Sequence, residues 1–223
     1  MGGRVRTLTE FDRLFAERHA WLAARQARLE RLRTTRDDRR SVSENLLHLQ
    51  LPGKDVALPV AVVGVHAGSD QLESLRVYHS LWPLIGAHRV RPPLLERDPS
   101  IHLCDVIAEY QQALHDGDIP AIVAAFEEDG YFREPAGGEY FYRGQEKLHE
   151  FMAHLLGSGG IHLEHCTATD DGVVCAIEFN AVKFGRQRLQ PQAGVAVYER
   201  GPSGRLHAAR IYDDVNVEAL AAS

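Results

Sequence analysis

Apolar and polar residues at the start of the chain repeat with helical spacing. Five apolar side chains recur at near-helical intervals, with Arg and Glu between them: Leu8, Phe11, Phe15, Leu22 and Leu29. Thr7 and Glu10 have the spacing of a capping box, in which each side chain binds a backbone N–H of the other residue. The pattern predicts an amphipathic helix from Leu8 to about Arg33.

A two-residue period then replaces the helical one. Apolar, β-branched segments separated by short turns predict three antiparallel strands, over residues 46–51, 56–65 and 72–82. The segment 87–100 carries three prolines and mixed charges without a period, which is typical of a linker. We therefore predict two units, residues 1–98 and 99–223.

The second unit begins with helices and ends with strands. Helical spacing predicts three helices, over residues 103–115, 119–128 and 145–156. Alternation predicts two short strands and four longer ones, over residues 131–134, 139–142, 161–169, 172–184, 189–199 and 205–215. Helices followed by hairpin-connected strands indicate an α+β fold.

One hairpin occurs twice. Residues 59–80 and 191–214 end in Arg76-Val77-Tyr78 and Arg210-Ile211-Tyr212, and placing Pro59 on Pro191 makes the second turn two residues longer. Hairpins in general share a hydrophobic pattern, but they do not share such an ending. We interpret the first unit as a truncated copy of the second, and we expect its strands to pair or pack against the second unit's sheet as an intrachain pseudo-dimer.

Composition and charge exclude several classes. The chain has 223 residues, 44% of them hydrophobic, and a net charge of -6. Residues 1–100 carry 16 Lys/Arg and 12 Asp/Glu, whereas 101–223 carry 9 and 19. The arginines of the first helix alternate with acids instead of aromatics, which argues against nucleic acid as a partner. The opposite charges instead favour attraction between the two halves.

Cysteine usage and hydropathy bear on location. The three cysteines follow no disulfide or metal-ligand spacing, and no 18-residue apolar segment occurs. We therefore expect a cytoplasmic protein that neither spans a membrane nor binds one. His149 and His154 resemble a zinc-protease helix, but their spacing of five residues places the rings on different faces. No metal and no cofactor are expected.

The second half resembles a known superfamily. Residues 110–135, the segment Arg143-Gly144-Gln145-Glu146, and Arg210 to Val215 resemble the SnoaL-like branch of the nuclear transport factor two-like superfamily, over about residues 101–220. Its members include ketosteroid isomerase, limonene epoxide hydrolase and polyketide cyclases. The resemblance implies a cone-shaped antiparallel sheet wrapped around helices, with an apolar pocket inside and a convex face free to dimerise.

The resemblance also implies site residues. Glu134 matches the general-base carboxylate of ketosteroid isomerase and Tyr110 its oxyanion tyrosine, the roles for which that enzyme is the standard example. The position of its third polar group, a protonated carboxylic acid, falls at about Gly194. Ketosteroid isomerisation itself is therefore not expected. The alternative is that Glu134 ends its strand in solvent.

Alternation assigns faces to the last strand. Arg210, Tyr212 and Asp214 share one face, and Ile211, Asp213 and Val215 the other. The family match implies that Tyr212 faces the pocket, which makes Asp214 a cavity acid/base. In the alternative, Arg210 pairs with Asp214 and only closes the cone. Ile211 and Val215 would then lie on a convex face suited to a homodimer.

Three further residues complete the candidate site. Glu178 and Asn180 share a strand face that is either the cavity or ordinary solvent-facing surface, and Phe132 lies two residues before Glu134. With Tyr212 and Arg210, they are the predicted substrate contacts. Tyr110, Glu134 and Asp214 are the predicted catalytic residues.

Two classes of function follow. The first is a cofactor-independent lyase, isomerase or cyclase that acts on a small hydrophobic carbonyl or polyketide-like substrate, with carboxylates moving the proton. Epoxide hydrolysis, in which such carboxylates activate water, is a variant. The second class is a non-catalytic ligand-binding or assembly module, because one fold supports many functions.

Overall fold

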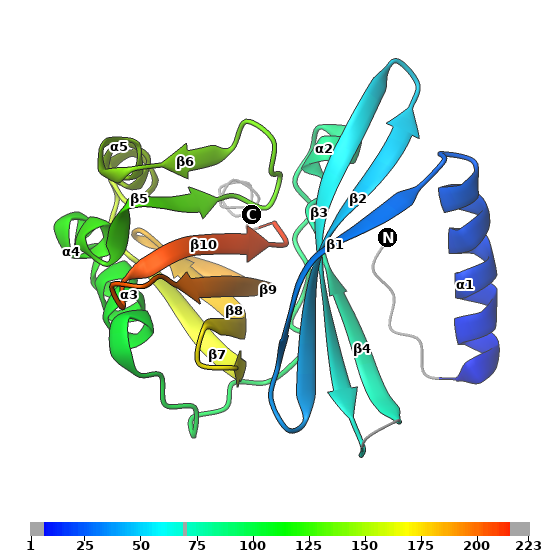
Figure 1. Ribbon diagram of the computed structural model, residues 1–223, viewed down its shortest axis with the longest axis horizontal. Coiled ribbons are helices and arrows are strands. Elements are labelled where there is room, and N and C mark those ends of the chain that lie inside the picture. Colours follow the sequence, from blue (N-terminus) through cyan, green and yellow to red (C-terminus); the bar gives the residue numbers. More distant parts are fainter. Residues whose placement is uncertain (1–6, 69–70, 215–223) are drawn as a thin grey trace.

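Two β-sheets pack against each other, and helices cover the far side of the second sheet (Figure 1). The computed structural model describes residues 7–68 and 71–214. The first sheet has the order β1-β2-β3-β4, with strands Arg28–Arg36, Arg40–Leu51, Lys54–His66 and Leu72–Tyr78. All of its neighbouring strands are antiparallel.

The second sheet has the order β6-β5-β10-β9-β8-β7. Its strands are β5 Phe126–Arg133, β6 Phe141–Arg143, β7 Ile161–Asp170, β8 Val174–Phe184, β9 Gln187–Arg200 and β10 Leu206–Tyr212. β10 pairs with β5 in parallel, so the expected all-antiparallel sheet is in fact mixed. The α+β fold class is confirmed.

Five helices accompany the sheets in the described part of the chain. They are α1 Leu8–Ala23, α2 Trp82–Ile85, α3 Asp105–Asp116, α4 Ile119–Ala124 and α5 Gln145–Leu155. α3, α4 and α5 cover the second sheet, whereas α1 lies at the far side of the first sheet (Figure 1). None of the described helices combines the length and apolar character needed to cross a membrane.

The first helix is shorter than its pattern suggested. The capping box of Thr7 and Glu10 is confirmed, but α1 ends at Ala23, and Arg28–Arg36 form strand β1. Gln26 adopts a left-handed φ of 48°, which breaks the helix. Pairing with β2 then satisfies the backbone of β1, so tertiary context overrides a helix-compatible sequence.

Other boundaries also moved. The strand expected over 72–82 ends at Tyr78, since Trp82 and Pro83 begin α2. The helix expected to reach residue 128 ends at Ala124, because the backbone from Phe126 onward pairs with β10. The strand expected over 131–134 begins earlier, at Phe126, and the other predicted elements of the second half are confirmed within three residues.

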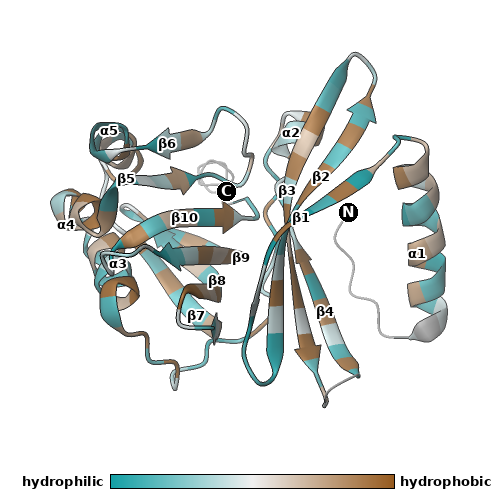
Figure 2. Cartoon of the chain, in the orientation of Figure 1, coloured by the Kyte–Doolittle hydropathy of each residue, from teal (hydrophilic) through white to brown (hydrophobic). Residues whose placement is uncertain are grey.

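The second sheet has two buried faces. Its helix face packs on α3, α4 and α5 through residues such as Ile177, Phe179 and Tyr198. Its other face, which we call the sheet-contact face, packs on the first sheet through Val195 and Tyr212, among others. Hydrophobic residues, shown in brown, are spread along the strands of both sheets (Figure 2). The first-unit strands thus pack against the second sheet. Their origin as a truncated copy stays a prediction.

Candidate functional site

The structure reverses the faces expected for the last strand. Tyr212 is fully buried on the sheet-contact face, and Ile211 packs toward the helix face. The expectation that Tyr212 lines a cavity inside the cone is therefore wrong, as is the convex position of Ile211. Val215 lies outside the described residues. The period of two was right, but a period alone cannot say which face meets which layer.

Arg210 and Tyr212 both bind Glu44 of the first sheet. The guanidinium of Arg210 donates to the two carboxylate oxygens at 2.7 and 2.8 Å, and the Tyr212 hydroxyl donates at 2.7 Å. Burial alone would lower the Arg210 pKa, but the carboxylate of Glu44 outweighs it and the pKa is raised. Arg210 also pairs with Glu199, and no Arg210–Asp214 pair forms. We call Glu44, Arg210 and Tyr212 the Glu44 cluster.

Glu178 forms a second cluster of the same kind. Its carboxylate accepts from Arg76 Nη2 at 2.8 Å, from the Tyr78 hydroxyl at 2.7 Å and from Thr167 Oγ1 at 2.6 Å. Only 2% of Glu178 is exposed. Glu178 therefore neither lines a cavity nor faces solvent. Its carboxylate instead joins the two sheets. We call these four residues the Glu178 cluster.

Asn180 lies on the same face as Glu178. Its side-chain Nδ2 donates to the carbonyl oxygen of Leu95 at 3.0 Å. The Oδ1 atom is buried, and the described residues offer it no hydrogen-bond donor. Asn180 thus holds the segment that connects the two sheets, and it does not face the helix-covered interior.

Asp214 also holds the connecting segment. Its oxygens accept from the backbone N–H groups of Leu81 and Arg89 at 3.2 and 3.1 Å, and from His88 Nδ1 at 3.1 Å. The carboxylate is 2% exposed. Three donors already use it, so Asp214 orients the exposed imidazole of His88 instead of facing a cavity.

Asp213 should make stability depend on pH. Burial raises its pKa to about 7, although Arg91 beside it acts in the opposite direction. The folded protein therefore keeps this proton up to about pH 7, whereas the unfolded chain loses it near pH 4. Ionising Asp213 costs folding free energy, so its contribution to stability falls as the pH rises from about 4 to 7.

Asp213→Asn isolates that effect. We expect the variant to gain stability relative to wild type by about 2 kcal/mol as the pH rises from 5 to 7. Urea unfolding of both proteins at each pH measures it. The comparison cancels the buried His79, whose pKa is lowered and whose contribution has the opposite sign. A difference that stays constant with pH would contradict the prediction.

The helix-covered interior is a packed core. Tyr110 is 1% exposed, with its ring 5.7 Å from Phe126 and 5.4 Å from Tyr198, and burial raises its pKa. Phe132 packs on Phe151 at 5.0 Å. Large apolar side chains thus fill the space where the resemblance implied an apolar pocket.

Gly194 shows why the third polar group is missing. An added Cβ at this position would lie 2.7 Å from the ring of Phe179. A carboxylic acid there would therefore collide with an aromatic side chain of the core. The position that the resemblance matches to the third acid of ketosteroid isomerase therefore has no room for an acid side chain.

Glu134 lies apart from the other two predicted catalytic residues. It follows β5 and accepts a hydrogen bond of 2.6 Å from the Tyr142 hydroxyl, whose ring stacks on Phe151 at 3.9 Å. Burial and this hydrogen bond raise the pKa of Tyr142. Tyr110, Glu134 and Asp214 each contact different groups, so the structure does not bring them together.

The described residues form a hollow of about 340 Å³ at the edge of the helix face. It lies between α3 and the edge strand β7, and we call it the α3–β7 hollow. Its walls combine apolar and polar side chains: Ile101, His102, Leu103, Ala108, Gln111, Gln112, His115, Ile161, Leu163 and His165. Its volume is within the range of small-molecule sites.

A hydrogen-bonded chain leads from this hollow into the core. Gln111 Nε2 donates to the Tyr198 hydroxyl at 2.8 Å, and its Oε1 lies 3.1 Å from His165 Nε2. That oxygen can only accept, so His165 carries its proton on Nε2 and keeps Nδ1 as an acceptor. Burial and the charge of Arg97 lower the His165 pKa, which keeps the ring neutral near pH 7.

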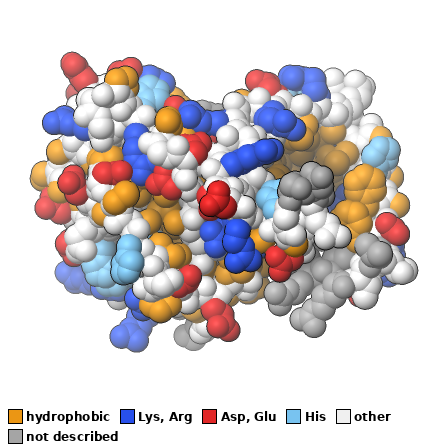
Figure 3. Space-filling view, turned by 60° about the horizontal axis from the view of Figure 1, so that its bottom comes forward, with side chains coloured by type: hydrophobic (Ala, Val, Ile, Leu, Met, Phe, Trp, Pro, Cys, Tyr) orange, Lys and Arg blue, Asp and Glu red, His pale blue; other side chains and the backbone are white. Residues whose placement is uncertain are grey.

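Histidines gather next to the hollow. The rings of His115 and His162 stack with their centroids 3.7 Å apart, and burial lowers the His162 pKa. In the space-filling view, histidine side chains lie together on the surface of the second half (Figure 3). Imidazole rings of this kind can stack on a ligand or bind it by hydrogen bonds.

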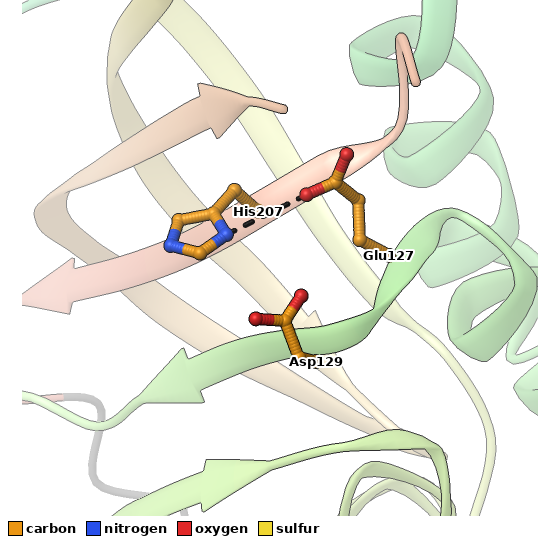
Figure 4. Close-up of side chains that lie close together, drawn as sticks. All are labelled: Glu127, Asp129 and His207. Atoms are coloured by element: carbon orange, nitrogen blue, oxygen red, sulfur yellow. Dashed lines mark ion pairs between the residues drawn. The ribbon is translucent and has the colours of Figure 1, made fainter. Parts of the chain in front are cut away.

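One group of side chains has metal-ligand chemistry. Glu127, Asp129 and His207 bring their ligand atoms within 4.8 Å of one another, on β5 and β10 (Figure 4). Glu127, however, accepts from the backbone and hydroxyl of Ser203 at 3.1 and 2.8 Å, which lowers its pKa. The carboxylate thus shapes the turn before β10, and we assign no metal to it.

The comparisons with known proteins identify the second half. Residues 107–207 match the family model described as SnoaL-like domain. These residues make up less than half of the chain, and they span the elements from α3 to β10. The chain therefore contains a SnoaL-like domain in its second half. No curated protein matches the chain.

Solved structures of similar fold cover about half of this chain. A putative polyketide cyclase from Sinorhizobium meliloti is 17% identical over 49% of this chain and 94% of its own, with a TM-score of 0.41. An epoxide hydrolase of M. tuberculosis is 19% identical over 48% and 80%, with a TM-score of 0.41. A hypothetical protein with a ketosteroid isomerase-like fold from Catenulispora acidiphila is 15% identical over 51% and 88%, at 0.43. Likeness at this level assigns no activity.

Sequence reasoning missed the residues that join the sheets and those that line the hollow. Glu44 is buried and fully bonded, yet no motif marks it. The repeated Arg-aliphatic-Tyr segment was the available signal. Two equivalent pairs of arginine and tyrosine need two equivalent carboxylates to accept their hydrogen bonds. Gln111 and His165 carried no such signal, since they are 54 residues apart and meet only through the fold.

Proposed function

We propose that the SnoaL-like domain binds a small, uncharged and largely apolar molecule in the α3–β7 hollow. The observation that carries this proposal is the composition of the hollow: aliphatic side chains beside the hydrogen-bonded pair Gln111 and His165, with His102, Gln112 and His115 also in its lining. Apolar surface supplies affinity and a few placed polar groups orient the ligand. A carbonyl or hydroxyl oxygen is the group that this pair is suited to bind.

The two members of the polar pair lie on different elements. Leu163 and His165 lie on β7, while Gln111 extends from α3. The ligand would thus lie between a helix and an edge strand. Tyr198 behind Gln111 fixes the amide orientation, which keeps the site preorganised.

A screen of small neutral carbonyl and aromatic compounds by protein-observed NMR tests the proposal. We expect binders that shift the amide signals of α3 and β7. Leu163→Trp should abolish binding because the indole fills the hollow, and Gln111→Leu should weaken it about tenfold by removing one hydrogen bond. Glu134→Gln is the matched control, because Glu134 does not line the hollow. Binding that survives Leu163→Trp would reject the site.

A second candidate is the cofactor-independent lyase, isomerase or cyclase, with epoxide hydrolysis as its variant. The observation that favours it is the partly buried Glu134–Tyr142 pair beside the aromatic core, which joins a carboxylate to a phenol. Asp214 and Tyr110 do not share this location, so Glu134 alone would move the proton. Turnover of a bound compound that is lost in Glu134→Gln but kept in Asp214→Asn supports this candidate; unchanged turnover in Glu134→Gln excludes it.

A further inference from the structure

The two sheets share one residue offset. Cross-strand neighbours form one row in each sheet: Glu44, Ala61 and Tyr78 in the first, and Glu178, Val195 and Tyr212 in the second. Each residue of the second row follows its counterpart by 134 positions. Arg76 and Arg210 are separated by the same number. The strands β1 to β4 therefore correspond in order and register to β7 to β10.

Two irregularities of the first sheet recur in the second sheet at the same offset. The outer strand of each sheet has a bulge at the same place, between Arg31 and Arg33 in β1 and between His165 and Thr167 in β7. In the last hairpin of each sheet, the register also shifts next to equivalent pairs of residues: His66–Leu72 in the first sheet and Arg200–Leu206 in the second. Bulges are specific features of a strand and not general consequences of pairing. Both sides of the last hairpin follow the offset of 134 residues, so its turn has the same length in the two sheets. The two-residue difference obtained by placing Pro59 on Pro191 is therefore wrong.

One turn is repeated in its hydrogen bonds. Asp37 Oδ1 accepts from the backbone N–H groups of Arg39 and Arg40 at 2.8 and 2.6 Å. Asp171 Oδ1 accepts from Val173 and Val174 at 3.0 and 2.7 Å. These aspartates and their donors are again 134 residues apart. An aspartate side chain thus makes the same turn between β1 and β2 as between β7 and β8.

The contacts between the sheets are reciprocal. Arg76 and Tyr78 of the first sheet bind Glu178 of the second, while Arg210 and Tyr212 of the second bind Glu44 of the first. The apolar contacts use equivalent positions as well: Val42, Ala61, Val63 and Tyr78 against Ala176, Val195, Val197 and Tyr212. In a twofold interface, position i of one copy contacts position j of the other, and the reverse contact also occurs.

We infer that residues 28–80 and 162–214 are two copies of one sheet, packed on each other about a pseudo-twofold axis. The first half is thus the built-in dimer partner of the SnoaL-like domain. It has no counterpart of α3, α4, β5 or β6 among the described residues, so it keeps the contact surface without the helix-covered interior. α1 takes the place of α5 in chain order. The sheet-contact face of the domain is consequently used within the chain, and a second chain cannot bind there.

Double-mutant cycles on the full chain test this inference. One cycle combines Tyr78→Phe with Glu178→Gln, and the other combines Tyr212→Phe with Glu44→Gln. Crossed controls combine Tyr78→Phe with Glu44→Gln, and Tyr212→Phe with Glu178→Gln. Thermal unfolding is measured for each variant, with circular dichroism to confirm the fold. Phe keeps the packed ring and Gln keeps the shape of the carboxylate, so the variants remain comparable.

We expect each Tyr→Phe variant to lower the melting temperature by about 5 °C. Each Glu→Gln variant should lower it further, because a largely buried arginine then loses its carboxylate partner. Within a cluster, the double variant should lose clearly less than the sum of its singles, because both changes remove one hydrogen bond. The crossed pairs should be additive, and the two cycles should give matching shifts. Additive behaviour within either cluster, or coupling in a crossed pair, would overturn the inference. If the Gln variants do not fold, unequal shifts for the two Tyr variants would overturn it as well.

Sedimentation of the wild type gives an independent measurement. The inference predicts a mass that does not change between wild type and the two Tyr variants, because the face they alter is occupied within one chain. A dimer that dissociates in Tyr78→Phe or Tyr212→Phe would show that the face joins separate chains, and it would contradict the built-in partner.

Discussion

Arg210→Met is expected to lower the free energy of unfolding by about 3–5 kcal/mol. The change leaves the carboxylate of Glu44, which is 1% exposed, without its guanidinium partner in a buried interface. An unpaired buried charge keeps its full desolvation penalty, and this penalty exceeds the net contribution of the original pair. The hydroxyl of Tyr212 alone cannot offset it. Urea unfolding measures the loss.

Two further variants separate charge from packing. Arg205→Met removes an arginine that is exposed on the same half, and it should change stability by less than about 0.5 kcal/mol. Adding Glu44→Gln to Arg210→Met should restore part of the loss, since no buried charge then remains unpaired. If Arg210→Met is as stable as Arg205→Met, the Glu44 cluster does not hold the sheets together.

Gly160→Ala is expected to cost about 3 kcal/mol, the upper range for overpacking a core position. An added Cβ would lie 2.1 Å from the carbonyl oxygen of His115 and 2.6 Å from that of Leu114. Both atoms belong to the backbone of α3, so relief requires the end of the helix to move. Such a movement would also displace His115 and Ile161, which line the α3–β7 hollow.

Thermal unfolding and ligand binding both report on this change. At about 2–4 °C per kcal/mol for a chain of this size, the melting temperature should fall by roughly 10 °C. Gly157→Ala is the matched control: its nearest atom lies at 3.2 Å and the residue is exposed, so the shift should be small. A Gly160→Ala protein that melts like the control would mean that α3 does not rest on the backbone at Gly160.

The positions that the resemblance matches to ketosteroid isomerase have different surroundings in this structure. Tyr110 and Gly194 lie on the helix face, as the resemblance implies, but Phe179 and Tyr198 fill the space between them. Arg210, Tyr212 and Glu178 join two sheets. The chain thus uses one face of a SnoaL-like sheet for an internal interface, and the other face for a core with a hollow at its edge.

The amino-acid sequence by itself determined most of the local structure. Strands and helices of the second half follow from the two periods in residues 101–214, and the capping box correctly placed the start of α1. The repeated Arg-aliphatic-Tyr signature predicted that one hairpin is duplicated, which stays a prediction. Local spacing suffices for these features because hydrogen bonds and side-chain directions within an element depend on near neighbours.

Only the tertiary structure decided which face of each strand meets which layer. Tyr212 and Ile211 alternate in either arrangement, but only packing shows that Tyr212 reaches Glu44, 168 residues away. Residues 28–36 suit a helix or a strand, and pairing with β2 selected the strand. Gln111 and His165 likewise meet only because α3 packs on β7. Contacts between distant segments depend on the packing of whole elements, and no local pattern encodes that choice.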